Sequence, residues 1–404
     1  MYSIFILFIF VSTLSASFKG IIVDANTYMP IQHATISGDR VSTRSDTQGN
    51  FIITTDTNKT LHVKALGYKP FHFTQEHPSL LKLQPIKVKA LYLNFWSASN
   101  NSKTLKRVLH IIDNTPINAL VIDVKNEYGS TQFLTGFERA NRYGAYKKRT
   151  NRNIKKFMEI MKQHSIYTIA RIVTFKDELQ ASNNYEYAIK KEDKTIWRNH
   201  DKMAWVDPFD TRAQDYAISI AEEAAKVGYD EINFDYIRFP ARKGLVFSKK
   251  NTEKNRVYAI EQFLKKAKKR LEEYGVFISV NTYGNVCWKS NDTGIGQTIA
   301  SLAKYADYIA PMLYPSGFSS GSFYVKYPSK HPYKVIFRSV KHMQSQVLLS
   351  RVRPWLQYFK DYSQLKKIYT RKEIQAQIKA SDDIGTNGWM FWSPSSRYSI
   401  EYLK

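Results

Sequence analysis

The sequence predicts an α/β protein in which a (β/α)8 barrel follows a small all-β sandwich. Short alternating strands separated by turn residues occupy residues 20–83, and after Pro85 an apolar stretch recurs eight times, mostly with a helix-like segment behind it. The 404 residues are 43% hydrophobic, which suffices for at least one large core and excludes disorder as the main state. A doubly wound sheet is the main rival, but no Gly-rich dinucleotide turn follows its first strand.

The chain opens on an uncharged apolar run. Residues 2–11 read YSIFILFIFV and precede the small residues Ser15, Ala16 and Ser17, which is the pattern of a secretory signal and its cleavage zone. We therefore predict a signal peptide over residues 1–17 and export to the periplasm or the cell exterior. A buried N-terminal strand is the alternative. The run is short for a membrane span and no later stretch is longer, so no transmembrane span is expected in the mature protein.

Residues 18–84 are predicted to form the β-sandwich. The phrases GIIVDANTYMPIQHATI and TRSDTQGNFII resemble the carboxypeptidase regulatory-like family of β-sandwiches. In this pattern Asp46 supplies an Asx-type turn, Gly49 a positive φ, and Phe51 returns to the sandwich core. A spacing or stabilising role without chemistry is expected for this module.

Residues 85–404 are predicted to form the barrel. Amphipathic runs at residues 102–114, 153–165, 211–228, 258–275, 298–306 and 371–385 read as its helices. The eight strands are expected at residues 90–96, 119–125, 167–175, 231–239, 276–283, 308–314, 352–359 and 388–393.

Active sites of such barrels lie at the carboxyl ends of the strands, so the polar and aromatic residues there are informative. Side chains two apart share a strand face, which can place Asp123 with Lys125, and Asn233 with Asp235, in one interior. Aromatic rings at the same ends suit the apolar faces of sugars. The expected substrate-binding residues are Lys125, Arg171, Asn233, Arg238, Asn281, Tyr283, Tyr314, Gln357 and Trp392.

Asp235 is the most informative of the polar residues at the strand ends. It interrupts the otherwise apolar strand INFDYIRF, where a carboxylate is costly to bury unless a partner or a substrate compensates. Arg171 and Arg238 are the candidate partners. An internal ion pair with no catalytic role is the alternative interpretation.

Nine ordered blocks carry a second resemblance, which spans nearly all of residues 90–400. They are VIDVKNEYG, ARIVTFKD, AWVDP, INFDYIRFP, DTGIGQ, DYIAPMLYPS, HPY, RPWLQ and GWMFWSPSSRY. Together they resemble a bacterial family of (β/α)8 barrels described as glycoside hydrolases. The resemblance implies that Asp235 is the strand-4 carboxylate acting as nucleophile or base. It also exposes a departure, because Asn281 stands where the family often has an acidic residue.

Glycoside hydrolysis usually needs a second carboxyl group. Asp123 is the first choice because its strand position aims it into the barrel mouth, although it could equally be a structural partner of Lys125 or Arg171. Glu127, Asp177 and Asp292 follow as further acid candidates on loops, with an anchoring role favoured for Asp292. A catalytically impaired carbohydrate-binding barrel and a substrate-assisted glycosidase are the alternative functions.

Composition narrows the remaining chemistry. The single Cys287 excludes an internal disulfide framework, and the nine histidines form no HxH or HExxH pair, so no metal and no cofactor are expected. The net charge of +25 permits an anionic partner. The basic runs at residues 145–156 and 264–270 read as solvated faces. The expected partner is therefore a carbohydrate, with an anionic glycan as one candidate, and nucleic acid is not expected. Nothing in the sequence predicts an oligomeric state.

Overall fold

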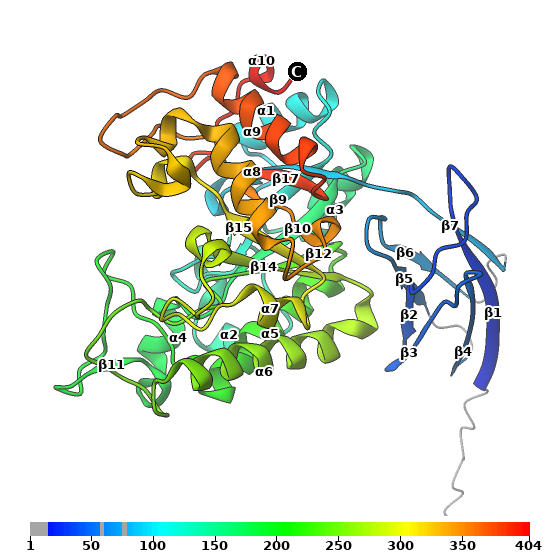
Figure 1. Ribbon diagram of the computed structural model, residues 1–404. Helices are drawn as coiled ribbons and strands as arrows, with labels where there is room; N and C mark the ends of the chain where they lie inside the picture. The colour runs from blue at the N-terminus through cyan, green and yellow to red at the C-terminus, as the bar shows by residue number, and fades with distance from the viewer. Residues whose placement is uncertain (1–14, 57–59, 75–78) are drawn as a thin grey trace, which may run out of the picture. The chain divides into compact units, whose positions relative to one another are not determined.

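The computed structural model describes residues 15–56, 60–74 and 79–404 and divides into two compact units (Figure 1). One unit ends at Pro85 and includes Glu272–Gly275; the other comprises Ile86–Leu271 and Val276–Lys404. The apolar run at residues 2–11 lies outside the described residues, so the signal peptide and export stay predictions. Within the described residues, no helix combines the length and apolarity needed to cross a membrane.

The first unit contains two small sheets that share a core. One sheet has the order β4-β1-β7 and the other β3-β2-β5-β6. Ile22, Ile36 and Val63 are fully buried in the common hydrophobic cluster. The strands are β1 (Ser15–Asp24), β2 (Thr35–Gly38), β3 (Val41–Arg44), β4 (Asn50–Asp56), β5 (Leu61–Lys64), β6 (Phe71–Phe73) and β7 (Leu80–Leu83).

The turn predicted before β4 has the expected local geometry. Asp46 accepts hydrogen bonds from the amides of Gln48 and Asn50, at 2.9 and 2.8 Å. Gly49 has φ +76°, and Phe51 is 3% exposed in the core. These features agree with the local interpretation of the motif, whereas the family resemblance of the module stays a prediction.

The second unit confirms the predicted (β/α)8 barrel. Eight strands form a closed ring in the order β10-β12-β14-β15-β16-β17-β8-β9, and every neighbouring pair is parallel. The strands are β8 (Val88–Leu93), β9 (Ala119–Lys125), β10 (Tyr167–Val173), β12 (Glu231–Asp235), β14 (Phe277–Tyr283), β15 (Tyr308–Met312), β16 (Trp355–Gln357) and β17 (Gly388–Trp392).

Helices follow the strands, and four of those in the described residues were not named by the sequence analysis. The longest of these four is α8, which begins with a proline at its first turn and buries Val335, Ile336, Val340 and Met343 at helical spacing. The helices are α1 (Lys103–Asp113), α2 (Glu138–Arg142), α3 (Ile154–Gln163), α4 (Glu178–Asn183), α5 (Thr211–Lys226), α6 (Glu253–Leu271), α7 (Ile299–Ala303), α8 (Pro332–Met343), α9 (Arg371–Asp383) and α10 (Ile400–Leu403).

The barrel interior changes from apolar to polar along the strands. On β9, Ala119 and Val121 belong to the hydrophobic cluster, and the next residue on the same face is Asp123. On β10, Tyr167 and Ile169 are followed in the same way by Arg171. The polar layer therefore lies at the carboxyl ends of the strands, where barrel active sites form.

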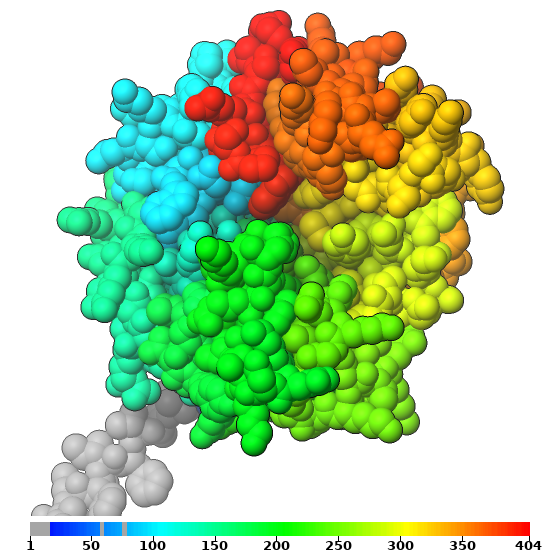
Figure 2. Space-filling model, turned by 90° about the vertical axis from the view of Figure 1, so that its left-hand side faces the viewer, coloured from blue at the N-terminus to red at the C-terminus, as the bar shows by residue number. Residues whose placement is uncertain are grey.

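Two long loops at this end of the barrel carry a small extra sheet. The loop after β10 contains β11 (Lys190–Lys191), which pairs antiparallel with β13 (Leu245–Val246) in the loop after β12. Figure 2 shows the face on which the chain colours run in order around the molecule, with a hollow at its centre. The green segment, which includes β11, borders this hollow.

Candidate active site

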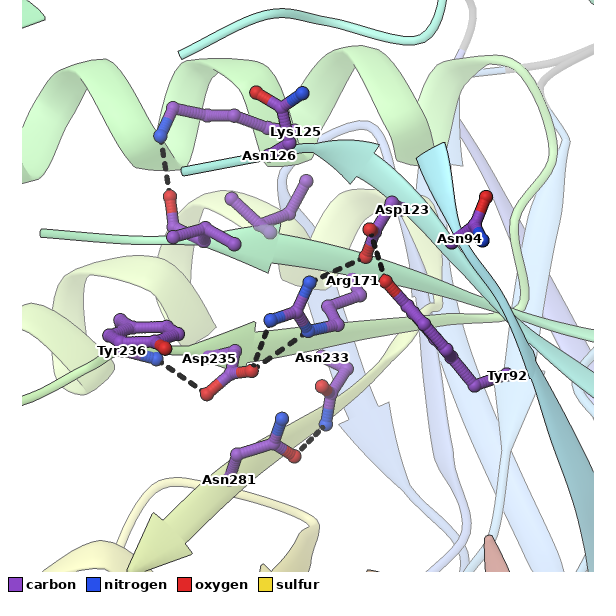
Figure 3. Close-up of polar contacts among 12 residues, drawn as sticks. Tyr92, Asn94, Asp123, Lys125, Asn126, Arg171, Asn233, Asp235, Tyr236 and Asn281 are labelled. Carbon is purple, nitrogen blue, oxygen red and sulfur yellow. Dashed lines mark hydrogen bonds and ion pairs between the residues drawn. The ribbon is translucent and has the colours of Figure 1, made fainter. Parts of the chain in front are cut away.

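One arginine links two carboxylates in the polar layer (Figure 3). Arg171 Nε and Nη2 contact Asp235 Oδ2 at 2.8 and 2.6 Å, and its Nη1 contacts Asp123 Oδ1 at 2.6 Å. The three side chains come from the adjacent strands β9, β10 and β12. Arg171 is thus the partner predicted for Asp235, and the two candidate acids are separated by the width of one guanidinium group.

Asp123 is buried and fully engaged. Its Oδ2 accepts a 2.5 Å hydrogen bond from the hydroxyl of Tyr92, and the residue is 3% exposed. Burial raises the pKa of Asp123, although Arg171 and Tyr92 oppose that shift. Tyr92 also stacks on Trp392, with ring centroids 3.9 Å apart. Sequence reasoning missed Tyr92, whose inward position on β8 was the available signal.

The turn at the end of β12 supplies a hydrogen-bond donor to the Asp235 carboxylate. Its Oδ1 accepts a 2.7 Å hydrogen bond from the backbone amide of Tyr236, which has φ +48°. A bulky residue rarely adopts this left-handed conformation, so the surroundings must impose it. The turn ends β12 at Asp235, earlier than the predicted end at residue 239, and directs an amide at the carboxylate.

Asn233 and Asn281 form a separate amide cluster beside this triad. Asn281 Oδ1 accepts hydrogen bonds from Asn233 Nδ2 at 2.9 Å and from the Trp355 indole at 2.8 Å. Asn233 Nδ2 also donates to Ser279 Oγ at 2.8 Å. Within the described residues, no hydrogen bond joins Asn233 to Asp235. The two side chains therefore have different hydrogen-bond partners, although they lie two residues apart on the same strand.

Lys125 and Asp177 pair with each other. Lys125 Nζ lies 2.8 Å from Asp177 Oδ2, and both side chains have no exposed surface. Asp177 also caps α4 by accepting from the Gln180 amide at 2.8 Å. Lys125 donates to the Val173 carbonyl at 2.5 Å as well. Lys125 is therefore the partner of Asp177, whereas the partner of Asp123 is Arg171. Asp177 is a buried structural carboxylate instead of a free acid.

The two other loop acids differ in environment. Asp292 binds Arg256 at 2.6 Å and accepts the amides of Gly294 and Gly296. Burial would raise the pKa of Asp292, but these hydrogen bonds outweigh it and lower the pKa. Asp292 is thus an anchor of its loop. Glu127 is half-buried, and its charge contributes to raising the pKa of Asp123, so it lies near the mouth.

The predicted substrate-binding residues divide between the mouth and its support. Burial, and then the charge of Asp235, raise the pKa of Tyr314 well above its ordinary value. Tyr283 is 50% exposed, and Trp392 lies under the Arg171 guanidinium at 5.0 Å. Gln357 is fully buried and donates to Ser316 Oγ at 2.6 Å. Gln357 therefore supports the neighbouring loop, and its assignment to the binding surface is corrected.

Arg238 does not pair with Asp235. It follows β12 instead of lying in it, and its Nη1 donates to the Phe239 carbonyl at 3.1 Å. The guanidinium lies 5.1 Å from the Trp205 ring centroid. Among the described residues, no group of three or more His, Cys, Asp or Glu side chains is arranged to hold a metal ion.

The chain thus has a closed (β/α)8 barrel with two carboxyl groups at its mouth. Glycosidases built on (β/α)8 barrels have the same two features. The family model described as "Putative glycosyl hydrolase domain" matches residues 90–398, and the chain belongs to that family. This membership supports a glycosidase-like function with a carbohydrate substrate. Among curated proteins, none matches the chain.

Several solved structures are similar to this chain, and the first described here shares its fold. The PgaB (BpsB) glycoside hydrolase domain from Bordetella bronchiseptica is 13% identical, covers 77% of this chain and 95% of its own, and has a TM-score of 0.54. A hypothetical protein from Ruminiclostridium thermocellum is 33% identical over 47% of this chain and 96% of its own, with a TM-score of 0.43. The Ostrinia furnacalis Group IV chitinase is 12% identical over 76% and 93%, with a TM-score of 0.46.

Proposed function

We propose that the chain hydrolyses O-glycosidic bonds of a polysaccharide or cell-envelope glycan, with Asp235 and Asp123 as its two carboxyl groups. The observation that carries the proposal is the shared guanidinium of Arg171, which binds one oxygen of each carboxyl group at the barrel mouth. Glycosidases usually use two carboxyl groups that flank the scissile bond. Membership of the glycosyl hydrolase family supports the same reaction.

Different environments favour different roles for the two acids. Burial raises the pKa of Asp123, which suits a group that must hold a proton until the leaving oxygen takes it. Asp235 receives hydrogen bonds from the Tyr236 amide and from Arg171, which stabilise its negative charge. Asp235 therefore acts as nucleophile or base, and Asp123 as proton donor.

The aromatic residues at the mouth would hold the sugar. Trp392, Tyr314 and the half-exposed Tyr283 come from the ends of β17, β15 and β14. Ring faces of this kind pack against the C–H faces of pyranoses. If the predicted signal peptide is correct, the glycan is met outside the cytoplasm.

The test is turnover by the full chain on a panel of polysaccharides, followed by assays of Asp235→Asn and Asp123→Asn on an oligosaccharide and on its activated aryl glycoside. A good aryl leaving group needs little protonation. Asp123→Asn should lose about 10²–10⁴-fold on the oligosaccharide and much less on the aryl glycoside. Asp235→Asn should lose turnover on both.

An exposed carboxylate on α9 provides the matched control, and Asp382→Asn should keep the wild-type rate on both substrates. Wild-type turnover by Asp235→Asn would contradict the proposal. An equal loss by Asp123→Asn on both substrates would remove Asp123 as proton donor.

A carbohydrate-binding barrel without turnover is the second candidate. It is favoured by Asn281, an amide fixed by Asn233 and Trp355 on the strand where the family resemblance leads one to expect an acid. Glycan binding by the wild type without cleavage of any substrate in the panel would support this function instead.

A further inference from the structure

A cleft of about 880 Å³ lies beside the barrel mouth, between the loops that follow β10 and β12. Its lining combines positive charge with two indole rings, and it includes Asp193 and Glu192 as its acidic residues. The residues that matter here are Lys191, Trp197, Trp205, Arg238, Arg242 and Lys243. The hydrolytic roles proposed above use none of this surface.

The positive charge of the cleft is largely unneutralised. Another lining residue, Arg198, is paired with Glu178 at 2.7 Å, and Asp193 is engaged by Thr195. In the described part of the chain, by contrast, no carboxylate lies within 4.0 Å of the charged groups of Arg238, Arg242 or Lys243. An anion entering the cleft would therefore meet three cations that form no ion pair within the described residues, against the opposing charge of Glu192.

Arg238 is held in place by aromatic rings. Its guanidinium lies 5.1 Å from the ring of Trp205, 5.2 Å from that of Tyr236 and 6.0 Å from that of Tyr283. The hydrogen bond to the Phe239 carbonyl uses one of the five N–H donors of a guanidinium. Burial lowers the pKa of Arg238, which reflects the cost of holding this charge away from water.

We propose that this cleft binds an acidic substituent of the glycan, a carboxylate or sulfate on a sugar ring, with Arg238 as its principal contact. The inference rests on the proposed function and makes an acidic polysaccharide the substrate class. A planar guanidinium can bind such an anion through two parallel hydrogen bonds, and its aromatic neighbours would contact the ring that carries it. Arg242 and Lys243 would add long-range attraction.

The position of Arg238 connects the cleft with the reacting carboxylate. The charge of Asp235 acts on Arg238, although the two do not form an ion pair. Tyr236 and Ile237 lie between them in sequence, and Tyr236 contacts both, with its amide on Asp235 and its ring beside Arg238. An acidic sugar bound at Arg238 would thus occupy a subsite adjacent to the glycosidic bond at which Asp235 acts.

The experiment is isothermal titration of the full chain with three oligosaccharides of equal length: an oligogalacturonate, a sulfated galactan and a neutral cello-oligosaccharide. Binding does not require turnover, so this result is independent of the hydrolysis assay. We expect at least one acidic ligand to bind about tenfold more tightly than the neutral one at low salt, and to lose this advantage at high salt. Comparison of the two acidic ligands distinguishes carboxylate from sulfate recognition.

Substitutions in the cleft test whether its cations cause the preference for the acidic ligand. Arg238→Gln should abolish the preference for the acidic ligand, Arg238→Lys should retain part of it, and the double variant Arg242→Gln/Lys243→Gln should weaken it about threefold. Arg107→Gln, an exposed arginine on α1, is the matched control and should keep the preference. The affinity for the neutral ligand should stay unchanged in the Arg242→Gln/Lys243→Gln variant, which separates anion recognition from misfolding.

Equal affinity for acidic and neutral ligands would overturn the inference, as would an acidic preference that survives in Arg238→Gln. If the wild type cleaves neutral glycans and ignores acidic ones, the cleft assignment fails while glycoside hydrolysis stands. If the acidic ligand binds through Arg238 but nothing is cleaved, the cleft assignment stands while hydrolysis fails.

Discussion

Replacing Arg171 with methionine tests the electrostatics of the candidate site most severely. The guanidinium makes three contacts with Asp123 and Asp235, which have only 4% and 8% of their side-chain surface exposed. Methionine fills a similar volume but supplies no charge. The variant would therefore leave two carboxylates close together in a site that water barely reaches.

The expected loss is large compared with the stability of a domain. Removing one partner from a buried ion pair typically costs about 3–5 kcal/mol of unfolding free energy. A whole domain is stabilised by about 5–15 kcal/mol, so this single change would remove a substantial fraction. Protonation of the abandoned acids would limit the loss, and this makes the effect depend on pH.

The direction of that dependence follows from Asp123. Burial already raises its pKa above 3.8 in the folded chain, and removal of Arg171, which lowers that pKa, would raise it further. When the pKa of a carboxyl group is higher in the folded chain than in the unfolded chain, the group contributes to the free energy of unfolding. This contribution is complete below the unfolded-state pKa and is lost as pH rises through the folded-state pKa. The loss in Arg171→Met should therefore be greater at pH 7 than at pH 4.5.

Tryptophan fluorescence during denaturation with urea is a suitable assay, because all seven tryptophans belong to the barrel. Arg107→Met on the exposed surface of α1 is the control, with an expected change below about 0.5 kcal/mol. Unchanged stability of Arg171→Met, or an equal loss at both pH values, would refute the account of two buried carboxyl groups that share one arginine.

Two further changes follow from the same contacts. Tyr92→Phe removes the 2.5 Å hydrogen bond to Asp123 and should cost about 1–3 kcal/mol in the same assay; no measurable change would show that the carboxylate does not depend on it. Arg353→Met should cost about 3–5 kcal/mol, because it abandons the fully buried Glu231 at the opposite end of the barrel, yet it should leave the affinity for glycans unchanged. Loss of glycan binding by the folded Arg353→Met variant would contradict the location of the site.

The sequence predicted the barrel because its strands are continuous apolar runs between amphipathic helices. The residues at which the strands end were predicted less accurately. The predicted strand 231–239 stops at Asp235, since Tyr236 adopts a positive φ that no local pattern announces. The predicted strand 352–359 shortens to Trp355–Gln357, directly after Pro354, which cannot donate to the sheet. Tertiary contacts decide such limits.

The candidate site was partly predictable for a related reason. Asp123, Arg171 and Asp235 interrupt apolar strands, and alternation along a strand places each of them inside. Their partners depend on how the strands pair, because the pairing of β8 with β9 brings Tyr92 to Asp123. The same limit applies to Asp177 and Asp292, whose cationic partners are Lys125 and Arg256. A sequence pattern identifies charged residues but not which opposite charge they meet.

The most direct test of the central claim, that Asp235 carries the chemistry, is a comparison of kcat and Kd for Asp235→Asn and the wild type on one glycan that the wild type cleaves. The account predicts a fall in kcat of at least about 10²-fold with Kd within a few-fold, because asparagine keeps the shape of the site but not its charge. Wild-type kcat in Asp235→Asn would contradict it.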